Sequence, residues 1–210
     1  MSNRYIIFFN LGTVEAGLYA AASKLPAIIN LASVIFQQAW QIAASKEYDD
    51  KCSRVFFSNV FKCYSAGILT FGSFVICSSD FLAVLMLKND FINAKNMLPL
   101  LILTAIINCY SIYFGTFYTA FKKNIMVMIS TIIGAIINIA ISLFFIDSYG
   151  VWACVIGSII CYMVIVLMRI YDTNKMINTD KDFKITVPAL VIVTTQAVCM
   201  TVSYTHLTLP

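Results

Sequence analysis

Charged residues are scarce in this chain, and their scarcity excludes an ordinary soluble domain. Only 11% of the 210 residues are Asp, Glu, Lys or Arg, whereas 60% are hydrophobic and the mean hydropathy is +0.86. Soluble domains usually contain about 45 to 50% apolar residues. The composition therefore predicts an integral membrane protein, and the net charge of +4 gives no sign of a nucleic-acid partner.

Histidine is almost absent, and the cysteines follow no metal-ligand spacing. The one histidine, His206, lies in residues 203–210, which fit no helix, resemble translated adapter sequence and are expected to be a non-native tail. The seven cysteines show neither paired spacing nor a ligand pattern, so we interpret them as small apolar packing residues. No metal ion and no other cofactor is expected.

Mostly apolar runs long enough to cross a bilayer recur along the chain. A hydrocarbon core of about 30 Å needs about 20 mostly apolar residues per helix. The runs predict an all-α polytopic membrane protein with six transmembrane helices, at residues 16–44, 58–87, 97–120, 125–146, 151–169 and 185–201.

The fourth and fifth of these helices predict a membrane hairpin. Only the tetrapeptide Asp147-Ser-Tyr-Gly150 separates them, so the chain must reverse tightly. Asn138 lies in the middle of the fourth helix, where lipid offers its amide no hydrogen-bond partner. We therefore expect the hairpin to pack inside a helix bundle.

Lysine and arginine are distributed unequally between the two predicted sides of the membrane. One side has nine of them: Lys46, Lys51, Arg54, Lys122, Lys123, Arg169, Lys175, Lys181 and Lys184. The other side has three: Arg4, Lys88 and Lys95. Because cytoplasmic loops are enriched in these residues, the connectors at 45–57, 121–124 and 170–184 are predicted to be cytoplasmic and the hairpin turn external.

Ionisable side chains within the spans, or beside them, are candidates for a polar cavity, because each is costly in lipid. Lys24 lies inside the first span, two residues before the helix-kinking Pro26. We interpret Lys24 as a cavity cation that neutralises an anionic substrate; the alternative is that it snorkels to the external interface. Arg4 and Glu15 either line a cavity mouth or mark the water boundary. Asp80 is either a proton or cation site or part of an interfacial turn.

The third span is unusually polar and aromatic for a membrane helix. Asn108, Tyr110 and Tyr113 are suited to sugar contacts, since a ring stacks on a pyranose and an amide or hydroxyl binds its edge. The same residues equally suit hydrogen bonds between helices. Trp40, near the end of the first span, is interpreted as part of an interfacial aromatic belt.

Short motifs follow one another in a definite order along the chain. They are Asn3-Arg-Tyr-Ile6, Glu15-Ala-Gly-Leu-Tyr19, Ser23-Lys-Leu-Pro26, Gln38-Ala-Trp40, Asp90-Phe91 with Ala94 and Pro99, Lys122-Lys123, and the hairpin with Asn138 and Tyr149-Gly150. In this order the chain resembles the oligosaccharide flippases of bacterial polysaccharide export, in the multidrug, oligosaccharidyl-lipid and polysaccharide exporter superfamily. It departs from them at Asn3, where that family more often has Asp.

The resemblance implies both an architecture and a function. Such flippases have twelve or fourteen helices in two lobes, so residues 1–202 would form a carboxyl-terminal lobe whose partner is a separate amino-terminal lobe. The function implied is translocation of a polyprenyl-diphosphate-linked oligosaccharide across the bacterial cytoplasmic membrane, with membrane lipids around the protein and no covalent chemistry. In related lipid II flippases the position that matches Lys24 carries an essential basic residue, which implies the same role for Lys24.

Two other functions are weighed against this hypothesis. A multidrug or cation antiporter of the same superfamily should hold buried carboxylates, and the spans offer only Asp80, near an end. A membrane polysaccharide polymerase or ligase needs acid, base or nucleophile candidates in a sizeable external loop, and the longest external connector is residues 88–96. We therefore expect a transporter and not an enzyme.

Overall fold

The computed structural model describes residues 2–46, 53–79, 81–82, 95–120, 124–177 and 183–207, and the regular structure within these ranges is helical. The all-α prediction is confirmed for this part of the chain. The helices are α1 (Ser2–Leu11), α2 (Thr13–Ala22), α3 (Lys24–Lys46), α4 (Ser53–Cys77), α6 (Leu98–Ala120), α7 (Asn124–Tyr149), α8 (Val151–Ile177) and α9 (Phe183–Leu207).

Four to five of these helices are long and apolar enough to cross a membrane. The four are α4, α6, α7 and α8, and the bent pair of α2 and α3 forms the fifth if it is one span. The sixth predicted span corresponds to α9, whose apolar part, Val187–Ser203, is shorter than the others. A multi-pass membrane protein is thus supported, and the sixth span stays a prediction.

One predicted boundary differs from the structure, and another is described only in part. The second span was expected at residues 58–87. α4 ends at Cys77, Ser79, Phe81 and Leu82 are again helical after a turn at Ser78, and residues 83–87 lie outside the described residues. No helix was expected from residue 203 onward, yet α9 continues to Leu207. The helix that includes Thr201 and Val202 continues into the following residues, because extending an existing helix costs less free energy than starting a new one.

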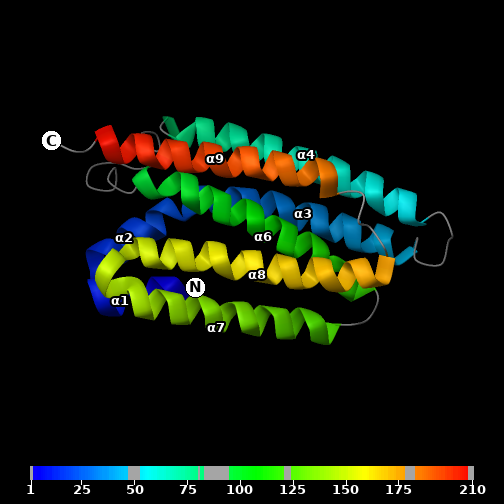
Figure 1. Ribbon diagram of the computed structural model, residues 1–210, viewed down its shortest axis with the longest axis horizontal. Helices are drawn as coiled ribbons and strands as arrows, with labels where there is room; N and C mark the ends of the chain where they lie inside the picture. The colour runs from blue at the N-terminus through cyan, green and yellow to red at the C-terminus, as the bar shows by residue number, and fades with distance from the viewer. Residues whose placement is uncertain are drawn as a thin grey trace.

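The long helices run side by side and form layers (Figure 1). The pair of α4 and α9 lies on one side, α3 and α6 occupy the middle, and α8 and α7 form the other side. Helix α6 contacts α3, α4, α7, α8 and α9, so it is the centre of the bundle. α3, α6 and α8 finish at the end of the bundle where α4, α7 and α9 start, which agrees with the predicted grouping of the three basic connectors.

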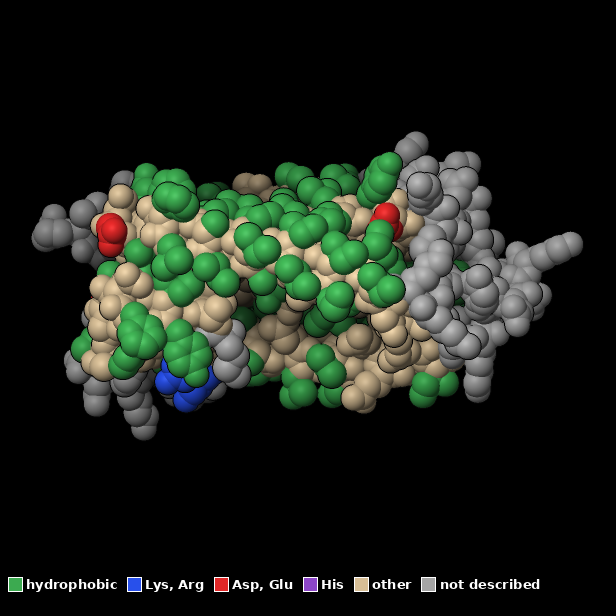
Figure 2. Space-filling view, turned by 90° about the horizontal axis from the view of Figure 1, so that it is seen from below, with side chains coloured by type: hydrophobic (Ala, Val, Ile, Leu, Met, Phe, Trp, Pro, Cys, Tyr) green, Lys and Arg blue, Asp and Glu red, His purple; other side chains and the backbone are tan. Residues whose placement is uncertain are grey.

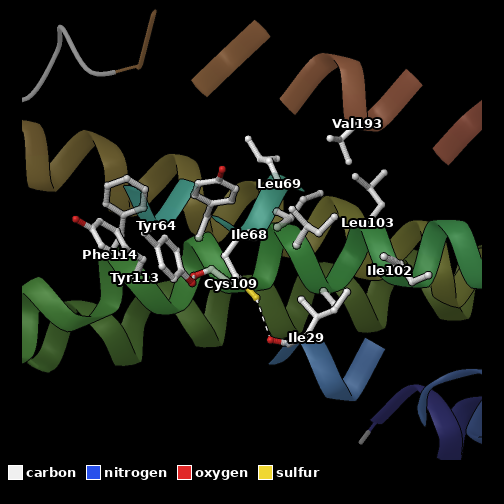
Figure 3. Packing of buried hydrophobic residues seen from close by; sticks show 14 of the residues in the cluster. Ile29, Tyr64, Ile68, Leu69, Ile102, Leu103, Cys109, Tyr113, Phe114 and Val193 are labelled. Atoms are coloured by element: carbon white, nitrogen blue, oxygen red, sulfur yellow. Dashed lines mark hydrogen bonds between the residues drawn. The ribbon is translucent and has the colours of Figure 1, made fainter. Parts of the chain in front are cut away.

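Aromatic side chains fill the interior between α3, α4 and α6 (Figure 3). The ring of Trp40 stacks on Tyr113 with 5.7 Å between centroids, and Tyr113 stacks on Tyr64 at 5.0 Å. Tyr64 donates to the Cys109 carbonyl at 3.0 Å and shares a 2.6 Å hydrogen bond with Ser33. Trp40 is only 4% exposed, so its assignment to an interfacial belt is wrong. The sequence indicates only that Trp40 lies near the end of a helix, whereas in the structure α4 and α6 cover its ring.

Helices α7 and α8 form the predicted hairpin. Gly150 is the single residue between them, and its φ of +56° is a left-handed conformation that glycine adopts without steric cost. Its N–H donates to the Ile146 carbonyl at 2.8 Å, which closes the last turn of α7. The buried residues of α7 recur every fourth position, at Ser130, Gly134, Asn138, Ser142 and Ile146. Small residues at this spacing let two membrane helices approach closely.

The opposite face of α7 is open and apolar. Large exposed side chains on this helix include Ile132, Ile136, Leu143 and Phe144, the last of them 83% exposed. Figure 2 shows hydrophobic side chains gathered in a band along this side of the molecule, interrupted by backbone and other side chains, with a few charged side chains. A surface of this size and composition is expected to face lipid.

Candidate functional site

A break in the first membrane segment shapes the site. α2 and α3 meet at Ser23 at an angle of 42°. Pro26 has no N–H, so it cannot donate to the carbonyl of Ala22 four residues earlier. The Ser23 hydroxyl donates instead to the Tyr19 carbonyl at 2.7 Å, beside the Ser23 N–H at 3.0 Å. The predicted kink is therefore confirmed, and it exposes polar backbone where the helices enclose a cavity.

The cavity has a volume of about 430 Å³ and lies among α1, the α2–α3 break, α6, α7 and α8. Its lining is rich in carboxamides, namely Asn3, Asn30, Asn108 and Asn138. Hydroxyl groups line it as well, from Tyr19, Ser23, Thr104, Ser158 and Tyr162. Such a collection of polar groups is unusual among apolar membrane helices, where each must be satisfied by protein or water.

One network in this cavity joins α1 to the α7–α8 hairpin. Asn138 donates from Nδ2 to Asn3 Oδ1 at 2.6 Å. Asn3 in turn donates from Nδ2 to Ser158 Oγ at 2.7 Å and to the Cys154 carbonyl at 3.0 Å. The prediction that the Asn138 amide finds a partner inside the protein is confirmed. Asn138 Oδ1 is buried and has no partner in the part of the chain that the structure describes, so this acceptor is available for a ligand or water.

A second amide pair links the middle helices. Asn108 on α6 donates from Nδ2 to Asn30 Oδ1 on α3 at 2.9 Å. Both residues are half-buried, and both line the cavity. Each carboxamide still offers a donor or an acceptor that the pair leaves unused.

The cavity lining has little charge. Arg4 is the only ionisable lining side chain apart from the phenols and the Cys161 thiol, and no carboxylate is among the described lining residues. A half-open cavity of amides and hydroxyls with the exposed Arg4 in its lining suits neutral hydroxylated or anionic molecules, and its described lining offers no carboxylate to hold a cation.

The structure brings two of the predicted site residues together. Arg4 and Asn108 both line the cavity. Lys24 is exposed at the start of α3, and Glu15 is half-buried on α2, and neither is in the lining. Asp80 lies outside the described residues.

Tyr110 and Tyr113 lie away from the cavity, in the aromatic interior. They are 5% and 2% exposed, and both rings pack near Tyr64, with centroids at 6.4 and 5.0 Å. Of the two interpretations of these tyrosines, this placement favours packing between helices, because an enclosed ring has no free face for a sugar. Their role in sugar binding is not supported by their position.

Several residues of the site were missed by the sequence analysis. Asn30 and Ser158 were not singled out, and Asn138 was interpreted as structural although it lines the cavity. The sequence signal that could have identified the two asparagines as cavity residues is the position of their amides in the middle of apolar helices.

Arg169 requires a correction as well. It was counted with the cytoplasmic loops, but it lies in α8 and is 5% exposed. Position along the sequence shows how near a cation is to a helix end, whereas packing decides whether it turns inward.

No protein-family model, curated protein or solved structure matches this chain.

Proposed function

We propose that this chain is a membrane-embedded lobe of a transporter that moves a polyprenyl-diphosphate-linked oligosaccharide across the bacterial cytoplasmic membrane. The observation that carries the proposal is the half-open cavity of amides and hydroxyls among helices long and apolar enough to cross a membrane. Carboxamides recognise sugar hydroxyls because each supplies both a donor and an acceptor. The order of the sequence motifs supports the same function.

Charge favours this substrate class over a cation. The cavity lining includes Arg4 and, among its described residues, no carboxylate that could attract a cation or exchange a proton with it. Arg4 offers a favourable contact for the diphosphate, since a guanidinium binds phosphate oxygens in pairs. Lys24, exposed beside the helix break, is proposed as a second cation for the diphosphate. The lipid tail would remain in the bilayer.

An export assay tests the proposal. The chain is joined to an amino-terminal lobe to give a two-lobed transporter, which is expressed in a bacterium that lacks its own flippase, and surface polysaccharide is measured. We expect the wild type to restore export and Asn108→Leu to reduce it several-fold, because one hydrogen bond contributes about 1 kcal/mol, or about a fivefold change in binding. Asn59→Leu is the matched control, because Asn59 is exposed on α4 outside the cavity lining.

The amount of each variant in the membrane separates loss of function from loss of protein. Lys24→Ala should also reduce export, and Lys24→Arg should retain it. Full export by both Asn108→Leu and Lys24→Ala, or no export by the wild-type two-lobed protein when it is present in the membrane, would contradict the proposal.

A further inference from the structure

Arg169 is a buried cation whose partners are all neutral. Its Nε donates to Ser130 Oγ at 3.1 Å, and its Nη1 donates to both the hydroxyl and the carbonyl of Ser111, the hydroxyl at 3.1 Å. Its Nη2 donates to Thr131 Oγ1 at 3.1 Å and to the Val127 carbonyl at 3.5 Å. These contacts join α8 to α6 and α7.

The positive charge of Arg169 has no anionic partner within the part of the chain that the structure describes. Asp172 lies three residues further along α8, but its Oδ2 accepts from the Tyr118 hydroxyl at 3.4 Å. Moving an ion out of water costs several kcal/mol, and hydroxyls and carbonyls offset only part of that cost. An anion close to the guanidinium would therefore be stabilised.

A surface groove lies next to this guanidinium. It has a volume of about 460 Å³ and is lined by Thr119, Asn124, Val127, Met128, Thr131 and Ile132. Two of these residues, Val127 and Thr131, are the ones that Nη2 contacts. Nη2 is thus separated from the groove by one layer of contacts, the Val127 carbonyl and the Thr131 hydroxyl.

The position of the groove indicates what occupies it. Asn124 is the first residue of α7, and Thr119 is the last residue of the span on α6, so the polar part of the groove lies at the end of the membrane spans. The apolar side chains of Met128 and Ile132 continue the groove along α7 toward the exposed apolar face. The distance along the helix from Asn124 to Ile132 is about 12 Å, at 1.5 Å per residue. A polar end followed by an apolar channel on a lipid-facing helix matches a lipid headgroup and its acyl chain.

We propose that this groove binds an anionic membrane lipid, with the headgroup phosphate near Thr119 and Asn124 and the charge of Arg169 behind Val127. Basic pockets between membrane helices near the cytoplasmic surface commonly hold anionic headgroups. In the sequence, Lys122 and Lys123 directly precede α7, and the charge asymmetry predicts this end to be cytoplasmic. The inference does not depend on the transported substrate.

Thermal unfolding of the purified chain in detergent tests the proposal. Phosphatidylglycerol, phosphatidylcholine and inorganic phosphate are titrated separately, and the apparent affinity is obtained from the shift in Tm. We expect phosphatidylglycerol to raise Tm saturably and by more than the other two additives. Arg169→Met should weaken that effect by about fivefold or more, because one cation near the membrane surface contributes about 1 kcal/mol to anionic lipid binding.

A second variant keeps the test decisive if Arg169→Met does not fold. Met128→Trp fills the groove and leaves the hydrogen bonds of Arg169 in place, because Met128 lines the groove and is not one of the residues that Arg169 contacts, and it should abolish the preference for phosphatidylglycerol. Ile136→Trp is the matched control, because Ile136 is 62% exposed on the same helix outside the groove. Equal effects of the two lipids, an unchanged lipid response in Met128→Trp, or a comparable effect of inorganic phosphate alone would overturn the proposal.

Discussion

At the scale of single residues, the buried polar side chains of this protein serve two different environments. Asn3 and Asn138 bond each other beside a cavity, where amide groups remain available. Arg169 instead lies among hydroxyls and carbonyls between three helices. Gly115 makes room for it: a Cβ at that position would come within 2.8 Å of Arg169 Nη1. The glycine and the arginine therefore depend on each other.

Substitution of this glycine should destabilise the protein. Gly115→Ala forces the guanidinium away from Ser111, and the loss of a hydrogen bond to a charged group costs about 1.5 to 3 kcal/mol. Gly67→Ala is the matched control, since a Cβ there meets nothing within 4 Å and alanine favours a helix by about 0.5 to 1 kcal/mol. Thermal unfolding in detergent compares the two variants, and an equal or higher Tm for Gly115→Ala would refute the dependence.

At the scale of secondary-structure elements, the α7–α8 hairpin is the part of the fold most directly encoded in the sequence. Its two apolar runs and the short polar turn were sufficient to predict it. The inward face of α7 is the one that carries the buried residues at every fourth position, most of them small. The helix then ends at the tight turn of Gly150. By contrast, the α2–α3 break lies at Ser23, and the proline that frees the backbone there is three residues further on.

The turn of the hairpin should tolerate only residues that adopt a left-handed conformation. Gly150→Val is expected to lower the stability by about 1 to 2 kcal/mol, the usual cost of that conformation for a residue with a Cβ. Gly150→Asn should cost less, because asparagine enters this region more readily. The two variants are compared by thermal unfolding, and identical Tm values would show that the turn conformation is not limiting.

At the scale of the whole molecule, the bundle has two chemically different ends. Three predicted basic connectors follow helices that finish at one end, and the hairpin turn lies at the other (Figure 1). The exposed apolar face of α7 between these ends is suited to lipid contact (Figure 2). The charge asymmetry predicts which end is cytoplasmic, and Arg169 contributes little to that asymmetry because it is buried.

Cysteine labelling can establish this orientation. In a background without the seven native cysteines, Tyr149→Cys places a thiol at the hairpin end and Ile125→Cys places one at the opposite end, at sites 61% and 70% exposed. A membrane-impermeant maleimide applied to intact cells should label Tyr149→Cys, whereas Ile125→Cys should react only after permeabilisation. The reverse pattern would show that the predicted orientation is inverted.

Composition and run length alone determine that this chain is helical, that it belongs in a membrane and where most of its helices lie, because lipid requires long uncharged helices whose backbone is satisfied internally. They do not determine which polar side chains meet. Asn3 and Ser158 are separated by 155 positions in sequence, yet they share a hydrogen bond. Trp40, Tyr113 and Arg169 turn inward because neighbouring helices cover them. Only tertiary packing decides such contacts, since the rotation of each helix about its axis is set by its partners.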